Sequence, residues 1–255
     1  MPTRFVDFMR VLVPMAGDDT TPEGEQVNIY GNHVGSWNFA ATAYLNRWKV
    51  KIYYEHYFDD HSQMFFQYGR WKDGHIGLEI TFPKNRFIDT FVYEGLGTKD
   101  QTGPMLYDSF WGKFEEQISA KDNYYNHYLY QGWQHWGMGI GNPLLPGPIY
   151  NKNGQITFIS NRVLAHHIGF CGSPCQSLSY RMLLSYSRHW GTYDNPLNEI
   201  KKQFNSLFEV TYAPQQLKGW SFTVSGAMDR GSLLGNNYGG MLVIRKQGII
   251  KSGNK

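Results

Sequence analysis

The sequence predicts an all-β protein: an antiparallel up-and-down transmembrane β-barrel, present in part, with about 11–12 strands of a larger barrel. Apolar and polar residues alternate with period two in one segment after another. Several of these segments run about nine to eleven residues, the length a tilted membrane strand needs. No apolar run approaches the roughly 18 residues of a membrane helix. Aromatic residues are 16% and charged residues 18% of the chain, a mix that suits pleated strands.

The first regular segments are residues 36–45 and 48–58. Apolar side chains such as Trp48 and Ile52 share one face of the second segment, and charged and polar ones share the other. Only Asn46-Arg47 separates the two segments, which predicts a tight hairpin.

The alternation recurs along the rest of the chain. The other regular segments are 76–82, 180–187, 204–212, 220–229 and 238–244. Less regular segments, also expected to be strands, lie near 3–13, 63–71, 87–94, 124–131 and 156–170. Aromatic residues gather near strand ends, as in the girdles of membrane barrels: Trp37, Trp48, Trp190, Tyr212, Trp220 and Tyr238. The alternative is a soluble antiparallel domain with one solvated face.

We treat residues 1–255 as a single barrel domain with a loop-rich insertion around residues 95–155. The insertion is dense in glycine, proline and aromatic residues and lacks alternation. Loops of this length are usually functional, and barrels carry their long loops on the outer side of the membrane.

A net charge of +3 is too small and too dispersed to indicate a nucleic-acid partner. The residues after Met1 lack the pattern of a secretory signal. Because membrane strands require export, we expect Met1 to be an internal start, with the signal and the first strands missing. Cys171 and Cys175 could close a small turn disulfide in an oxidising compartment or remain thiols, and the sequence leaves both open.

Eight stretches then resemble one known family. They are Gly31–Trp37, Tyr93–Pro104, Asp122–His127, Gly132–His135, Ile140–Leu145, Asn161–His167, Trp190–Tyr193 and Leu234–Asn237. In order and number these stretches resemble the Wzi capsule-assembly family, in the form found in Bacteroides-like bacteria, from about residue 27 to 248. The resemblance implies an outer-membrane barrel with an associated helical part. It also implies a lectin that holds capsular polysaccharide at the cell surface, in contact with membrane lipid and other capsule-export components. Members of the family are nearly twice as long, and their N-terminal portion is absent here.

Sugar binding needs aromatic faces for pyranose rings and planar polar groups for hydroxyls. An acidic glycan adds a need for arginine or lysine. The candidate carbohydrate-binding residues are Asn123, Asn126, Tyr130, Trp133, Gln134, His135, Trp136, Arg162 and Arg188. The alternative is that the aromatic residues of this group only pack the loop onto the barrel rim.

Arginines on membrane strands are expected on the polar face, because facing lipid costs about 2–4 kcal/mol at the membrane midplane. Arg162, Arg181 and Arg188 would then attract an anionic glycan or pair with one of three glutamates across the strands. These glutamates are Glu79, Glu94 and Glu209.

No metal, cofactor or catalytic residue is predicted. His166 and His167 are neighbours in a strand and point to opposite faces, so they cannot share one ion. Ser187 and His189 share a strand face, but no Gly-x-Ser-x-Gly elbow accompanies them.

The sequence is therefore interpreted as an outer-membrane capsule assembly protein that binds capsular polysaccharide and anchors it at the cell surface. The first alternative is an outer-membrane porin or glycan-uptake channel. The second is a secreted glycan-acting enzyme on a soluble β fold.

Overall fold

The computed structural model describes residues 4–13, 15, 17–21, 26, 31–58, 73–85, 87–101, 123–127 and 131–248. Helix α1 (Phe5–Leu12) and the short 3-10 turn η2 (Pro148–Tyr150) accompany the strands. The strands are β1 (Gly35–Leu45), β2 (Trp48–Phe58), β3 (Gly74–Thr81), β4 (Thr90–Gly97), β5 (Gln134–His135), β6 (Met138–Gly139), β7 (Val163–Cys175), β8 (Leu178–Gly191), β9 (Pro196–Tyr212), β10 (Trp220–Gly231) and β11 (Asn237–Lys246). No helix within these ranges is long and apolar enough to cross a bilayer.

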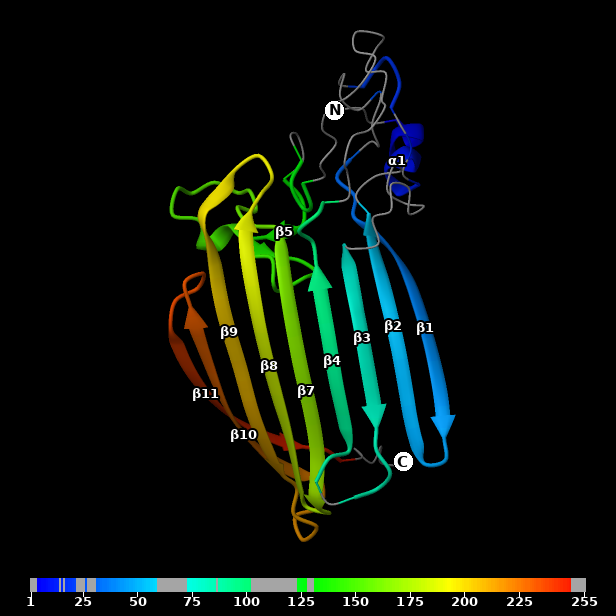
Figure 1. The fold of residues 1–255 in the computed structure, drawn as a ribbon, viewed down its shortest axis with the longest axis vertical. Coiled ribbons are helices and arrows are strands. Elements are labelled where there is room, and N and C mark those ends of the chain that lie inside the picture. The colour runs from blue at the N-terminus through cyan, green and yellow to red at the C-terminus, as the bar shows by residue number, and fades with distance from the viewer. Residues whose placement is uncertain are drawn as a thin grey trace, which may run out of the picture.

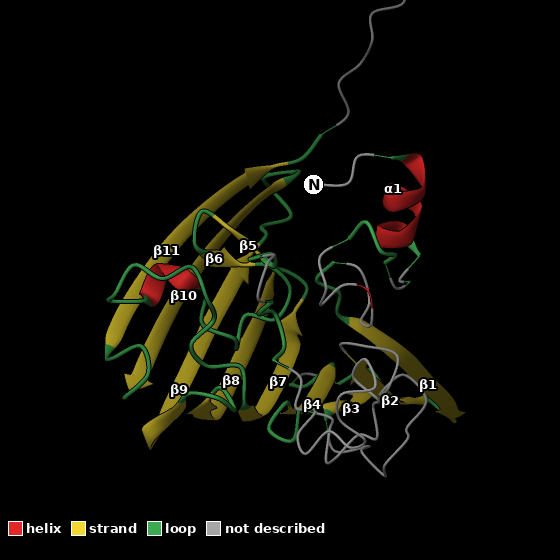
Figure 2. Cartoon of the chain, turned by 90° about the horizontal axis from the view of Figure 1, so that it is seen from above, coloured by secondary structure: helices red, strands yellow, loops and turns green. Residues whose placement is uncertain are grey.

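Nine strands form one antiparallel sheet in the order β1-β2-β3-β4-β7-β8-β9-β10-β11 (Figure 1). The prediction of an all-β, up-and-down architecture is confirmed. The sheet is open: within the described residues β1 and β11 are its two edges, and it does not close into a barrel. Seen from above, the sheet is curved, and the small ribbon of β5 and β6 sits in the hollow of the curve (Figure 2).

The two ends of the sheet differ. At one end, here called the turn end, short connections such as 46–47 and 176–177 join the strands. At the other, the loop end, the connection 98–162 joins β4 to β7. The predicted hairpin at 46–47 is confirmed, and Asn46 takes the left-handed backbone conformation that asparagine tolerates (φ 56°).

The pairing register places apolar side chains on one face of the sheet across all nine strands. One row that crosses the whole sheet on this apolar face is Ala43, Val50, Ile80, Phe91, Phe170, Met182, Phe208, Gly226 and Gly240. A row on the opposite, polar face is Tyr53, Gly77, Glu94, His167, Ser185, Asn205, Asp229 and Asn237. The alternation read from single strands therefore adds up to two continuous surfaces of opposite character.

The distribution of buried side chains is inverted relative to a water-soluble protein. Among the described residues, seven apolar side chains are buried and thirteen polar ones are. The apolar cluster is small and lies at the loop end, where the insertion packs on the polar face; it consists of Leu96, Tyr125, Leu145, Phe158, Val163 and Ala165. Meanwhile Val224 and Leu242, on the apolar face, are 61% and 64% exposed. The large apolar surface of this protein thus faces outward from the sheet.

The strand expected at residues 3–13 is wrong, because this segment contains helix α1. Its apolar residues Phe5, Phe8 and Leu12 recur with the three-to-four-residue spacing of a helix, and strict alternation is absent. Arg4 and Asp7 exchange hydrogen bonds across the first turn, which satisfies backbone groups at the helix start.

Other irregular segments have mixed outcomes. The strand expected at 87–94 is present as β4, and the one at 156–170 begins only at Val163. Residues 123–127 and 131 form no strand, whereas residues 128–130, with the candidate Tyr130, and the whole segment 63–71 lie outside the described residues. Both cysteines are free thiols at the turn end of β7, where the pairing register shifts.

Candidate functional site

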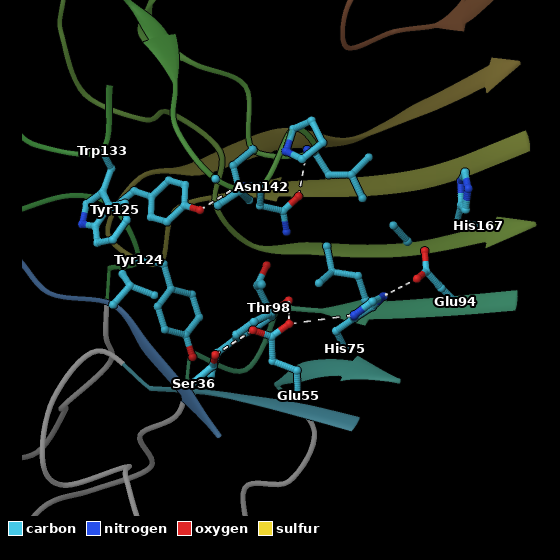
Figure 3. Close-up of a pocket in the computed structure, with 18 of the residues that line it drawn as sticks. Ser36, Glu55, His75, Glu94, Thr98, Tyr124, Tyr125, Trp133, Asn142 and His167 are labelled. Atoms are coloured by element: carbon cyan, nitrogen blue, oxygen red, sulfur yellow. Dashed lines mark hydrogen bonds and ion pairs between the residues drawn. The ribbon is translucent and has the colours of Figure 1, made fainter. Parts of the chain in front are cut away.

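A cavity of about 620 Å³ lies between the polar face of the sheet and the insertion, at the loop end (Figure 3). The sheet contributes Ser36, Glu55, Tyr57, His75, Glu94, Leu96, Ala165, His167 and Ser185. The insertion contributes Tyr124, Tyr125, Trp133 and the segment 141–145. Residues far apart in the sequence meet here because adjacent strands carry their polar side chains at the same height.

The sheet side of the cavity is acidic and hydrogen-bonded. His75 lies between two carboxylates: its Nδ1 is 3.9 Å from Glu55 Oε2 and its Nε2 is 3.5 Å from Glu94 Oε1. Ser36 Oγ donates to Glu55 Oε1 at 2.6 Å, and the Tyr53 hydroxyl donates to Glu94. These contacts hold both carboxylates in place, and among the described lining residues there is no lysine or arginine.

The opposite side of the cavity is aromatic and rigid. Tyr125 stacks on Trp133 with ring centroids 5.2 Å apart and meets Phe158 edge-on at 5.1 Å. The Tyr125 hydroxyl accepts a hydrogen bond from the Asn142 backbone N–H at 2.9 Å. Burial raises the pKa of Tyr125, so the phenol stays neutral at physiological pH. Tyr125 and Trp133 both have positive φ, a strained state that the surrounding contacts must maintain.

Asparagine side chains fix the insertion. Asn126 accepts from the Phe158 N–H and donates to the Phe158 carbonyl, each at 2.8 Å. Asn161 donates to Asn123 Oδ1 at 2.6 Å and to the Tyr124 carbonyl at 2.8 Å. The bonds to the Phe158 and Tyr124 backbone satisfy polar groups that an irregular segment does not pair within itself.

The structure divides the group of candidate sugar-binding residues. Trp133 lines the cavity, whereas Trp136 is 85% exposed and His135 is exposed beside it. Gln134 accepts a hydrogen bond from the Gly137 N–H at 2.8 Å and so holds the turn between β5 and β6. Asn123 and Asn126 have the anchoring contacts described above.

The expectation that Arg162 and Arg188 lie on the polar face is wrong. Arg188 pairs with Leu164 across β7, in the row that belongs to the apolar face, and Arg162 lies two residues further toward the loop end. Both positions lie past Tyr186, the last aromatic residue of the apolar face on β8 before Arg188. Arg181 does lie on the polar face and pairs with Glu209 at 3.4 Å.

The structure places the two pairs that the sequence analysis singled out, His166 with His167 and Ser187 with His189. His166 contacts the Tyr93 hydroxyl on the apolar face, and His167 contacts Ser185 on the polar face, as predicted for strand neighbours. His189 Nε2 is 2.9 Å from Ser187 Oγ. Its Nδ1 has no hydrogen-bond partner in the described part of the chain, so no carboxylate orients the ring there. Within the same residues no group of His, Cys, Asp and Glu could hold a metal ion.

Sequence reasoning missed most of the sheet side of the cavity, including Glu55, His75 and Tyr57. The signal was present, since these residues fall on polar-face positions of β2 and β3. Their convergence needs the register between strands, which one sequence does not give.

The sequence matches no protein-family model, and no curated protein matches it either.

Proposed function

We propose that this chain is part of an outer-membrane β-barrel and that its cavity binds a polysaccharide at the cell surface, as the resemblance to the Wzi capsule-assembly family suggests. In this proposal the apolar face contacts lipid, the polar face lines the interior, and the loop end is extracellular. The chain would anchor capsule by many weak contacts along a repeating polymer, made strong by avidity.

The height of the apolar face supports the membrane part of the proposal. From Leu178 to Tyr186, outward residues of β8 are apolar or aromatic. That stretch rises about 27 Å along the strand, or about 20 Å along the membrane normal at a tilt of about 40°. The apolar band of outer-membrane barrels is about 25 Å tall, so the height of this stretch differs from it by about one outward-facing residue position.

The observation that carries the sugar-binding part is the stacked pair of Tyr125 and Trp133 opposite a row of hydrogen-bonding groups. An aromatic wall can cover the C–H face of a pyranose ring. Ser36, Glu55 and His75 offer donors and acceptors to its hydroxyls from the other side. A cavity of about 620 Å³ has room for a short oligosaccharide segment.

The charges of the cavity favour a neutral sugar or an amino sugar over a uronic acid. A uronate carboxylate held about 6 Å from Glu55 would be repelled by about 3 kcal/mol at an effective dielectric constant of about 20. A protonated amine at the same place would be attracted by a similar amount. The arginines that an acidic glycan would need, Arg162 and Arg188, do not line this cavity.

Two tryptophans of the insertion provide a matched test. Trp133 and Trp136 both have positive φ (56° and 52°), but only Trp133 lines the cavity. We expect Trp133→Ala to weaken oligosaccharide binding by about tenfold or more, as loss of a stacking aromatic does, and Trp136→Ala to leave it unchanged. Calorimetric titration of the detergent-solubilised chain with neutral, amino-sugar and uronate oligosaccharides measures both the variants and the charge preference. Equal affinity of the two variants for every oligosaccharide would refute the assignment of the cavity.

In the cell, a strain that lacks the complete gene should shed capsule into the medium. Cell-bound capsule that is unchanged in such a strain would count against the anchoring role.

A further inference from the structure

A group of five cations, here called the cation cluster, lies at the loop end of the apolar face; it consists of Lys99, Arg162, Arg188, Lys202 and Arg230. Three of them lie on the neighbouring strands β8, β9 and β10, and Arg162 immediately precedes β7, the next strand of the sheet (Figure 1). Arg188 and Lys202 are directly paired across β8 and β9. Arg230 pairs with Phe204, two residues from Lys202, and so is its diagonal neighbour.

Trp190 lies within the cation cluster. Lys99 Nζ is 5.0 Å and the Arg188 guanidinium 5.2 Å from its ring. One indole thus holds two cations close to each other. Arg162 in turn stacks over Tyr193 at 5.7 Å and hydrogen-bonds to the Lys99 carbonyl, which draws the loop end of β7 into the same group.

No acidic side chain of the described residues pairs with the cation cluster. None of the ion pairs found within the described residues includes any of its members. On the polar face, by contrast, Lys49 pairs with Glu79 and Arg181 pairs with Glu209. Positive charges gathered in this way repel one another and create a potential that attracts anions. The charge of the cluster is therefore available to a ligand outside the chain.

The height of the cation cluster indicates which anion. Tyr186 and Phe204 lie one outward position below Arg188 and Lys202, at the edge of the apolar surface. A ligand here must present anionic groups immediately beside apolar chains. Two of these cations are arginines with apolar cross-strand neighbours: Arg188 pairs with Leu164, and Arg230 pairs with Phe204. Guanidinium groups bind phosphate oxygens in a bidentate manner.

We propose that the cation cluster binds the phosphate groups of a phosphorylated glycolipid in the outer leaflet, a lipid of the lipid A type. This inference rests on the membrane insertion proposed above. The lipid would lie with its acyl chains along the apolar face of β7 to β10 and its phosphates between Arg188, Lys202 and Arg230. The cavity on the polar face takes no part in this contact.

The experiment uses the full chain in detergent micelles and follows thermal unfolding by circular dichroism. Diphosphorylated lipid A, the same lipid without phosphates, and inorganic phosphate are added in turn. We expect only the phosphorylated lipid to raise the midpoint of unfolding. The variant Arg188→Gln/Lys202→Gln/Arg230→Gln should bind that lipid about tenfold or more weakly.

Lys246→Gln is the matched control. Lys246 also stacks on a tryptophan of the apolar face, with its Nζ 5.3 Å from the Trp220 ring, but at the turn end. The Lys246→Gln variant should bind the phosphorylated lipid as tightly as the unchanged chain does. The circular dichroism spectrum of the triple variant without lipid checks that its sheet forms. If the sheet does not form, Lys202→Gln alone replaces the triple variant, and we expect a severalfold loss of affinity for the phosphorylated lipid.

Three results would overturn the inference: an unchanged affinity in the charge-removed variant, an equal response to the lipid without phosphates, or an equal response to inorganic phosphate alone. Flotation of the chain with phospholipid vesicles tests insertion separately. A chain that does not float refutes the proposed function as well, whereas a chain that floats but ignores the lipid phosphates refutes only the cation cluster.

Discussion

Replacing a mid-height residue of the apolar face by arginine tests whether that face contacts lipid. On β9 Phe208 lies midway between Phe204 and Tyr212, which end the apolar stretch of that strand on the same face. The exposed fractions of Phe208 and Tyr212 are nearly equal, 51% and 50%. In water the two positions should respond alike. In a bilayer Phe208 is near the midplane, where arginine costs about 2–4 kcal/mol, and Tyr212 is about 10 Å nearer the interface, where it costs about 0–1 kcal/mol.

We therefore expect Phe208→Arg to reduce the free energy of unfolding in vesicles by about 2–3 kcal/mol more than Tyr212→Arg. This is a difference of about 30- to 150-fold in the folding equilibrium. Alanine variants at both positions correct for the lost aromatic rings. Guanidinium titration of the vesicle-inserted chain, followed by tryptophan fluorescence, gives the four values. The reasoning fails if the two arginine variants behave alike, or if the chain forms the same sheet in buffer without lipid or detergent.

Two further substitutions test how the polar face and the insertion are held. Gly77→Ala should destabilise the sheet by about 1–3 kcal/mol in the same titration, because an added Cβ would lie 2.0 Å from the Tyr53 ring that packs over it. Gly226→Ala is the control and should be neutral or stabilising, because open space surrounds Gly226. Equal effects of the two substitutions would contradict this reasoning. Asn126→Ala removes both hydrogen bonds to the Phe158 backbone and should reduce the local stability of the insertion by about 2–3 kcal/mol. We expect faster proteolysis within residues 131–162, while the circular dichroism spectrum of the sheet stays unchanged. Unaltered proteolysis would show that other contacts suffice.

The sequence predicted the sheet well because its main signal is local. Alternation such as that from Trp48 to Phe58 follows from the pleat alone, and Asn46 marks the turn before it. Where alternation was weak, as in 3–13, the helical spacing of Phe5 and Phe8 competed with it and formed α1. Segments with a clear period were assigned correctly, whereas those without one had mixed outcomes, from β4 near 87–94 to the helix at 3–13.

The cavity and the cation cluster could not be predicted in the same way, because both depend on distances between strands. Glu55 and Glu94 meet on either side of His75 only because β3 lies between β2 and β4 in one particular register. Arg188 was expected on the polar face by a rule for the membrane midplane. Its strand continues past the apolar residues, and in a membrane that rule would not apply there.

The position of both proposed sites at one end of the sheet bears on how capsule would be held. His167 and Ser185, which line the cavity, and Arg188 of the apolar face lie on adjacent strands β7 and β8, within a few residues of each other along the sheet. A polysaccharide in the cavity and a glycolipid phosphate on the cation cluster would then sit at about the same height on the two sides of a single layer of backbone. Force on the polymer would be transferred through hydrogen-bonded strands to a contact with the outer leaflet. The share of force on Tyr125 and Trp133 would pass to the sheet through the contacts that hold the insertion, among them the hydrogen bonds of Asn126 and Asn161. Anchoring strength would accordingly depend on the cation cluster as well as on the sugar-binding residues.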